Sequence, residues 1–479
     1  MTILLYAVTT ALALAVAALS KSQKLMHWTS IAHAMAYLLI SVYTIIYAVI
    51  PTFYMDNRYL FIDHLGIYEV LIASVVFLLA AIYAGGYADC LISAKELDRK
   101  NLKLFYLSFN ALLALTSMAF FSNNLGLFWI LAELTTIFSA ILVAILNAKD
   151  NIDAALKYIF TTSTSMLFSF IGLILLFALT QGVAGTGTLN WDALMAMANA
   201  LSPGILAAAF VFTFIGFGAK SGIVPFHTWL PHAHAKAPSV ISAILSAALL
   251  NVGIYGIIRM FAITRAASAS YVLIFFGLLS VAIAALSMLQ QKNTKKLIAF
   301  SSIEQMGMIL IAIGIGTAAS VFWALALIFA HALTKSLLFF SAGALHRQYG
   351  SNRIDDIWDV FRLQPLAATG MILGIAGIIG APPFALFVPK LFVLAAIGSF
   401  STLLLFAVLA FLLVAVAAFT VFLTCMVSQS DAEKIRAVQI PVGMKIPIIM
   451  LIALIIIGGI FFPAELHAML TSIVVELGL

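Results

Sequence analysis

Apolar segments of roughly 18 to 25 residues follow one another along nearly the whole chain, separated by short polar connections. Each segment is long enough to cross about 30 Å of hydrocarbon as an α-helix. With 64% hydrophobic and 9% charged residues and a mean hydropathy of +1.16, the chain has too few polar side chains to cover a soluble protein. A membrane barrel would instead show short strands of alternating polarity. We therefore predict an all-α polytopic membrane protein.

The hydropathy pattern predicts about fourteen transmembrane helices, near residues 3–19, 29–50, 64–87, 103–122, 125–147, 155–180, 204–225, 237–262, 270–289, 296–315, 320–343, 365–397, 402–426 and 445–463. Eighteen of the 24 Lys and Arg residues then fall in the loops that follow odd-numbered spans, whereas Arg58, Arg259 and Arg265 belong to even-numbered loops and adjoining helix ends. By the positive-inside rule, the odd-numbered loops are cytoplasmic and both termini lie outside. The net charge of +6 reflects this bias and indicates no nucleic-acid partner.

Four ionisable residues lie deep in predicted spans: Glu133, Lys220, Lys335 and Lys390. A charge at the bilayer centre costs about 2.5 to 3.5 kcal/mol, so these side chains are expected to face one another or water. His331 precedes Lys335 by one helical turn and shares its helix face. A structural ion pair or a snorkelling side chain explains any single residue of this kind. Four in one chain favour a proton or ion path.

Two of these lysines lie where helix-breaking residues gather. Lys220 in the seventh span is surrounded by Gly216, Gly218, Gly222 and Pro225, and Lys390 in the twelfth span follows Gly380, Pro382, Pro383 and Pro389. Proline removes a backbone donor and clashes with the preceding turn, so both helices are expected to be interrupted inside the membrane. Interrupted helices in two halves of a chain are typical of inverted-repeat transporters.

Three histidines, His227, His232 and His234, follow Lys220 closely. No nearby carboxylate or cysteine completes a metal-ligand set, so we expect no metal and interpret the histidines as lining a wet cytoplasmic cavity that relays protons. Two cysteines, Cys90 and Cys425, exclude a disulfide framework or a thiolate-ligated cluster. We expect no cofactor, and if the chain takes part in redox chemistry the electrons travel elsewhere.

Several motifs resemble, in order, the antiporter-like subunits of complex I and its relatives: the L, M and N subunits of complex I, the D subunit of Mrp sodium/proton antiporters and subunits of group 4 nickel–iron hydrogenases. The motifs are SNNLGLFWILAELTTIFSAILV, AALKYI, KSGIVPFHTWLPHAHAKAPSVISAILSAALLNVGIYG, SSIEQMG, HALTKSLLFFSAG and GAPPFALFVPK. The sequence ISAILSAALLN is most similar to that of the hydrogenase-4 F subunit. A prokaryotic plasma (inner) membrane is therefore expected.

The resemblance implies two inverted five-helix repeats with broken helices seven and twelve. The corresponding segments are an N-terminal three-helix segment (1–102), the first repeat (103–265), the second repeat (266–430) and a C-terminal helix with a short tail (431–479). It also implies that Glu133 pairs with Lys220, that His331 and Lys335 form a central relay, and that Lys390 leads to the outside.

The eighth span departs from the complex I pattern. Complex I members normally place a histidine and a lysine there, whereas ISAILSAALLNVG offers Ser246 and Asn251. These two side chains and ordered water would have to connect Lys220 with His331.

The resemblance predicts a proton-translocating, non-catalytic subunit of a redox-driven complex, either a membrane-bound hydrogenase or a complex I type. Expected partners are other membrane subunits, including further antiporter-like subunits, a peripheral redox arm and the lipid bilayer. Two alternatives stay open: a subunit of an Mrp-type sodium/proton antiporter, and a structural membrane anchor without transport.

Overall fold

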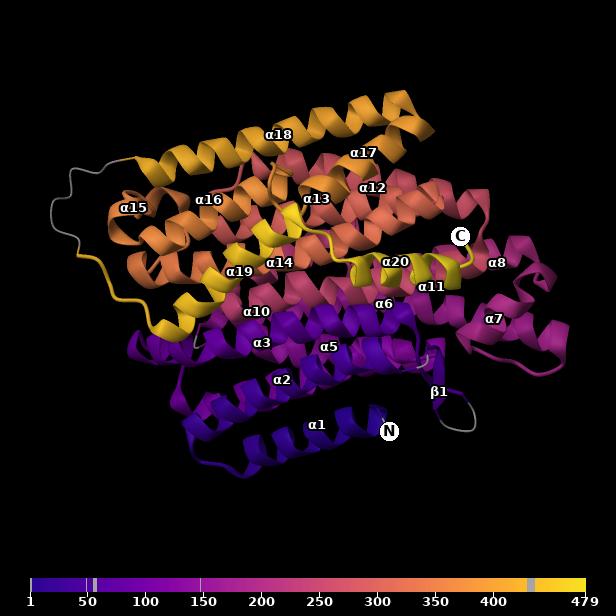
Figure 1. Ribbon diagram of the computed structural model, residues 1–479, viewed down its shortest axis with the longest axis horizontal. Helices are drawn as coiled ribbons and strands as arrows, with labels where there is room; N and C mark the ends of the chain where they lie inside the picture. The colour runs from indigo at the N-terminus through magenta and orange to yellow at the C-terminus, as the bar shows by residue number, and fades with distance from the viewer. Residues whose placement is uncertain (1, 49, 55–57, 147, 429–435) are drawn as a thin grey trace.

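The computed structural model describes residues 2–48, 50–54, 58–146, 148–428 and 436–479. Its helices lie side by side in one bundle (Figure 1). Helices suit this sequence because each one satisfies its own backbone hydrogen bonds where no water is available. A short antiparallel hairpin, β1 (Thr52–Tyr54) with β2 (Leu60–Ile62), pairs Phe53 with Phe61 at one end of the bundle.

Within the described residues, thirteen helical segments are long and apolar enough to cross a membrane. They are α1 (Thr2–Leu19), α2 (Gln23–Tyr47), α3 (His64–Ser93), α4 (Leu102–Phe120), α5 (Leu125–Val143), α6 (Lys149–Ala184), α8 (Pro203–Lys220), α10 to α11 (Ser239–Thr264), α12 (Ala267–Met288), α13 (Thr294–Ile315), α14 (Ala318–Tyr349), α18 (Thr402–Val427) and α19 (Val442–Ile460). Shorter helices are α7 (Trp191–Met197), α9 (Trp229–Lys236), α15 (Val360–Leu363), α16 (Pro365–Ile379), α17 (Phe387–Phe400) and α20 (Ala464–Glu476).

The two predicted helix interruptions are present. α8 ends at Lys220, and the chain turns through Gly222, whose φ of 71° suits glycine, before α9 begins. α16 ends at Ile379, turns through Gly380 with a φ of 86°, and α17 follows from residue 387. Neither α16 nor α17 alone spans a bilayer. Together they correspond to the twelfth predicted span, which brings the number of spans in the described residues to the predicted fourteen. The inverted relation of the two repeats stays a prediction, and the segment boundary at residues 430 and 431 lies outside the described residues.

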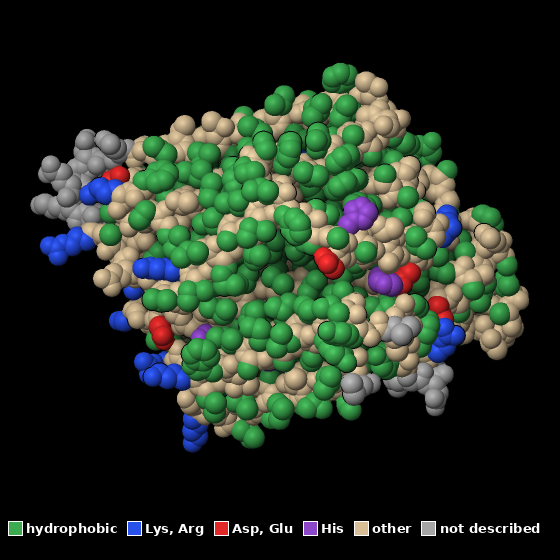
Figure 2. Space-filling view, viewed as in Figure 1, with side chains coloured by type: hydrophobic (Ala, Val, Ile, Leu, Met, Phe, Trp, Pro, Cys, Tyr) green, Lys and Arg blue, Asp and Glu red, His purple; other side chains and the backbone are tan. Residues whose placement is uncertain are grey.

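Burial divides the helices into an inner and an outer set. Every residue of the span Ser239–Thr264 is buried, and α3, α13 and α14 are also mostly buried. Outer helices such as α18 expose large apolar side chains, for example Leu403, Phe406 and Leu413. The exterior face in Figure 2 is mostly hydrophobic, and Lys and Arg side chains gather at its left-hand end. This pattern is that of a bundle with lipid around it and a charged rim.

Arg259 lies near a helix end, as predicted, and is buried there. The side chain is buried near the end of α11 and forms an ion pair of 2.5 Å with Asp63, the residue that caps the N-terminus of α3. Its guanidinium lies 4.3 Å from the Trp191 ring centroid. This buried pair joins α11 to the N-terminal end of α3.

Candidate functional site

Lys220 is the last residue of α8, and its ammonium is held by one turn of α5. Nζ lies 2.6 Å from the Ala132 carbonyl oxygen, 2.7 Å from Thr135 Oγ1 and 2.6 Å from Thr136 Oγ1. Both threonine hydroxyls direct their protons to the Ala132 carbonyl, so both oxygens accept from the lysine. These three acceptors match the three N–H donors of a charged ammonium. The C-terminal end of α8 also favours a positive charge.

Glu133 does not form the expected ion pair with Lys220. Among the ion pairs of the described residues, Glu133 has none; instead Ser163 Oγ on α6 donates to its Oε2 at 2.8 Å. Its Oε1 is buried without a hydrogen-bond partner in the described structure. Lys220 Nζ binds the carbonyl of Ala132, the residue before Glu133. The Lys220 ammonium and the Glu133 carboxylate are therefore close neighbours that form no ion pair.

Lys335 and His331 lie one turn apart at the fully buried centre of α14. Lys335 Nζ donates to the Ile298 carbonyl at 2.8 Å and to Ser301 Oγ, both on α13. Neither ring nitrogen of His331 has a hydrogen-bond partner in the described part of the chain. An imidazole with two free nitrogens in an enclosed site can accept a proton from one neighbour and pass it to another.

Lys390 lies in the first turn of α17 and pairs with a carboxylate that the sequence analysis did not select. Its Nζ is 3.4 Å from Glu304 Oε1 on α13 and 3.3 Å from the Ile378 carbonyl at the end of α16. Both charged side chains are almost completely buried. Gln305 Nε2 donates to both Glu304 and the Ile378 carbonyl, at 2.9 and 3.2 Å, and fixes the pair against the helix break.

Ser246 and Asn251 find different partners on either side of the eighth span. Ser246 belongs to a π-helical turn, Leu245–Leu249, a feature frequent at functional sites, and its Oγ lies 2.8 Å from Ser302 Oγ on α13. Asn251 Nδ2 donates to Glu69 Oε2 on α3 at 3.0 Å. Span eight is therefore connected to α13 through one residue and to α3 through the other.

Helix α13 connects several of the predicted residues, and the sequence analysis missed its role. Ser302 meets Ser246, Ser301 meets Lys335, and Glu304 meets Lys390. The sequence could have indicated two further residues. Glu69 and Glu304 are acidic residues inside the predicted spans 64–87 and 296–315, and an ionisable residue inside a span was the criterion that selected Glu133.

The three histidines after Lys220 lie in different surroundings. His232 is exposed, His227 is partly buried and His234 is completely buried. The His234 ring stacks on Phe339 of α14 with centroids 4.7 Å apart, one turn beyond Lys335, and both its nitrogens lack partners among the described residues. Within the described residues no group of three His, Cys, Asp or Glu side chains could hold a metal ion.

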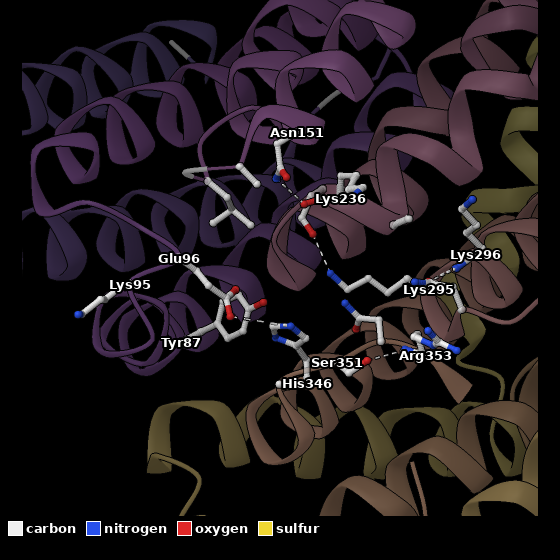
Figure 3. A pocket seen from close by; sticks show the side chains of 17 residues that line it. Tyr87, Lys95, Glu96, Asn151, Lys236, Lys295, Lys296, His346, Ser351 and Arg353 are labelled. Carbon is white, nitrogen blue, oxygen red and sulfur yellow. Dashed lines mark hydrogen bonds and ion pairs between the residues drawn. The ribbon is translucent and has the colours of Figure 1, made fainter. Parts of the chain in front are cut away.

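A cavity of about 600 Å³ opens where helix ends from both halves of the chain meet. Its walls carry Lys236 of α9, Lys295 of α13, His346 of α14 and Glu96 from the connection after α3, and the three histidine rings above are not among its lining side chains (Figure 3). Lys295 donates to the Ala237 carbonyl at 2.7 Å. Burial raises the pKa of the Glu96 carboxyl, and the charges of Lys295 and Arg347 oppose that shift. Ala237, on the wall, is one turn from His234.

Comparisons with known proteins agree with this architecture. A family described as NADH:quinone oxidoreductase/Mrp antiporter, TM matches residues 122–419. The Hydrogenase-4 component F homolog of Methylacidiphilum infernorum is 32% identical over 354 residues, 73% of this chain and 74% of that protein.

Solved structures share the fold. A chain of the membrane-bound sulfane sulfur reductase, an archaeal respiratory membrane complex, has a TM-score of 0.86 at 22% identity, covering 99% of this chain and 96% of that one. A chain of the Mrp complex from a Dietzia species has a TM-score of 0.86 at 18% identity, with 98% and 96% covered. The predicted resemblance is confirmed: the chain belongs to the NADH:quinone oxidoreductase/Mrp antiporter transmembrane family, as a multi-pass, antiporter-like membrane subunit.

Proposed function

We propose that this chain is a proton-translocating subunit of a redox-driven membrane complex of the hydrogenase or complex I type. The observation that carries the proposal is a set of ionisable and polar side chains enclosed in the helix bundle. Glu133 is partly buried, with its Oε1 enclosed. The fully buried members are Lys220, Ser246, Asn251, His331, Lys335 and Lys390. Charged groups inside a membrane bundle are costly and mark ion paths, and here two lie at helix interruptions.

Protons would be taken up at the lysine-rich end, which the positive-inside rule makes cytoplasmic, and both termini would face outside. The cavity is lined by Lys236 and Lys295, at helix ends on this lysine-rich side. His234 lies one turn from Ala237 on the cavity wall and stacks on Phe339, one turn from Lys335. His227 and His232 would serve the same uptake side. Release would follow past Lys390.

The switch in this proposal is the distance between Glu133 and Lys220. A carboxylate close to a buried ammonium favours the charged form, and its withdrawal favours proton release. Glu133 has one unpartnered buried oxygen and a neutral serine as its present donor, so a change of partner leaves no other charge unpaired. Turnover of a redox partner that moves α5 against α8 would therefore alternately load and unload Lys220.

The test is redox-driven proton translocation by the intact complex in proteoliposomes. Lys220→Ala and Glu133→Gln are expected to abolish translocation and leave assembly intact, while Lys445→Gln, at an exposed position of α19, is expected to leave it unchanged. Normal translocation in Lys220→Ala would overturn the proposal.

An Mrp-type role is the second candidate, because the Mrp chain matches this fold with the same TM-score as the respiratory one. Sodium-dependent proton exchange without any electron donor would select it. Ion movement retained after neutralising Lys335 and Lys390 together would instead favour a structural anchor.

A further inference from the structure

Glu69 on α3 is a buried carboxyl group that the proposed relay does not use. Its side chain is 1% exposed, and the amide of Asn251, itself 0% exposed, donates to Glu69 Oε2 at 3.0 Å. Asn251 lies on the eighth span, where the resemblance to complex I subunits implies a charged residue. The structure thus supplies a titratable group at this place from another helix.

Glu69 has no cationic partner among the ion pairs of the described residues. On α11, Tyr255 and Arg259 share the face of Asn251, but Arg259 is already bound to Asp63 at 2.5 Å and to the Tyr255 hydroxyl at 2.7 Å. Glu69 Oε1 and Asn251 Oδ1 are both buried without partners in the described structure. An enclosed carboxylate with a single neutral donor costs several kcal/mol, so the side chain is stable here as a neutral acid that carries a proton.

The helix that carries Glu69 is in contact with elements on both sides of the proposed relay. Next to Lys220, Ser221 Oγ donates to the Leu250 carbonyl at 3.2 Å, and Leu250 directly precedes Asn251. On the other side, Tyr68, the neighbour of Glu69, donates from its hydroxyl to the Leu325 carbonyl of α14 at 2.7 Å. α14 is the helix of His331. α3 also packs against the π-helical turn that contains Ser246.

We propose that Glu69 is a proton-binding site that replaces the missing charge of the eighth span and passes protons between Lys220 and His331. This inference rests on the proposed function. The Glu69 acid first gives its proton to the His331 imidazole and becomes a carboxylate. A proton then leaves the Lys220 ammonium, which becomes an amine, and converts this carboxylate back to the acid. Asn251 is the positioning residue, because its Nδ2 donates to the transient anion.

The experiment compares Glu69→Gln with Lys220→Ala in the intact complex, reconstituted in vesicles and driven by its redox reaction. Gln can still accept from Asn251 but cannot carry a proton, so translocation should fall to the Lys220→Ala level while assembly is kept. Glu465→Gln, an exposed carboxyl on α20, is the matched control and should match the wild type. Wild-type translocation in Glu69→Gln together with none in Lys220→Ala would overturn this inference alone, whereas translocation in both would overturn the proposed function.

Infrared spectroscopy of the wild-type complex and Glu69→Asp provides a second readout if the glutamine variant does not assemble. The C=O band of a protonated carboxylic acid should shift between the two proteins and respond to deuterium exchange during turnover. No difference in that band would contradict a protonated Glu69.

Discussion

The two broken helices hold their lysines in opposite ways. In the first, Lys220 is the last residue of α8, and three neutral oxygens of α5 hold its charge. In the second, Lys390 lies in the first turn of α17, and its main partner is the Glu304 carboxylate of α13. The C-terminal end of a helix stabilises a cation and the N-terminal end disfavours one. The neutral cage at Lys220, formed by the oxygens of Ala132, Thr135 and Thr136, is thus sufficient to stabilise its ammonium. Lys390 needs an acidic partner for the same purpose.

The two lysines also differ in whether a carboxylate forms an ion pair with them. Glu133 faces Ser163 and leaves Lys220 without a carboxylate, whereas Glu304 and Lys390 are in contact at 3.4 Å. If the fifth and tenth predicted spans, α5 and α13, correspond in the two predicted repeats, Glu133 and Glu304 occupy matching places. One carboxylate–lysine pair is then separated and the other is in contact. The proposed relay with alternating steps would pass through such a state.

Removing each carboxylate should give the largest contrast between the two sites. Glu304→Gln leaves Lys390 charged and buried at a helix N-terminus, and we expect a loss of about 3–5 kcal/mol in unfolding free energy. Glu133→Gln keeps an acceptor for Ser163 and breaks no ion pair, so the loss should stay below about 1 kcal/mol. Denaturation of the purified subunit in mixed micelles measures both. Equal losses would contradict the comparison.

The neutral cage around Lys220 predicts a smaller effect of its own. Thr135→Val removes one oxygen acceptor from a buried ammonium and should cost about 1.5–3 kcal/mol, the range for hydrogen bonds to charged groups. Thr213→Val on α8 is the matched control, because that buried hydroxyl donates only within its own helix. A Thr135→Val cost no larger than the control would mean that Lys220 is uncharged in the resting protein.

The turns at the two interruptions give the smallest contrast. Gly222 and Gly380 both have positive φ, and alanine at either should cost about 1–2 kcal/mol in stability. A Cβ on Gly380 would lie 2.9 Å from Lys390 Cδ, whereas one on Gly222 would meet Leu230 Cδ1 at 2.6 Å. Gly380→Ala should therefore also slow translocation, and Gly222→Ala should change stability alone. Identical transport in the two variants would contradict this assignment.

Much of the fold could be predicted from the sequence because bilayer thickness and proline chemistry constrain it directly. The fourteen spans and both interruptions followed from apolar segment length and from residues such as Pro225 and Pro383. The positions of Lys220, Lys335 and Lys390 followed from the cost of charge in lipid.

The partners of those lysines could not be predicted in the same way. The threonine cage around Lys220 depends on how α5 rotates against α8, and hydropathy does not determine that rotation. Glu304 and Glu69 were visible as acidic residues in spans, but their pairing with Lys390 and Asn251 depends on contacts between helices distant in sequence. The sequence predicts Arg259 at a helix end, but its burial and its ion pair with Asp63 depend on how the helices pack.

In the proposed relay, protons pass Lys220 first and Lys390 last. The most direct test of this order is a single turnover of the complex in vesicles, with pH indicators reporting uptake on the lysine-rich side and release on the other. Lys390→Ala should keep a burst of uptake and lose release, and Lys220→Ala should lose both. Undiminished release in Lys390→Ala, or a normal uptake burst in Lys220→Ala, would contradict the account.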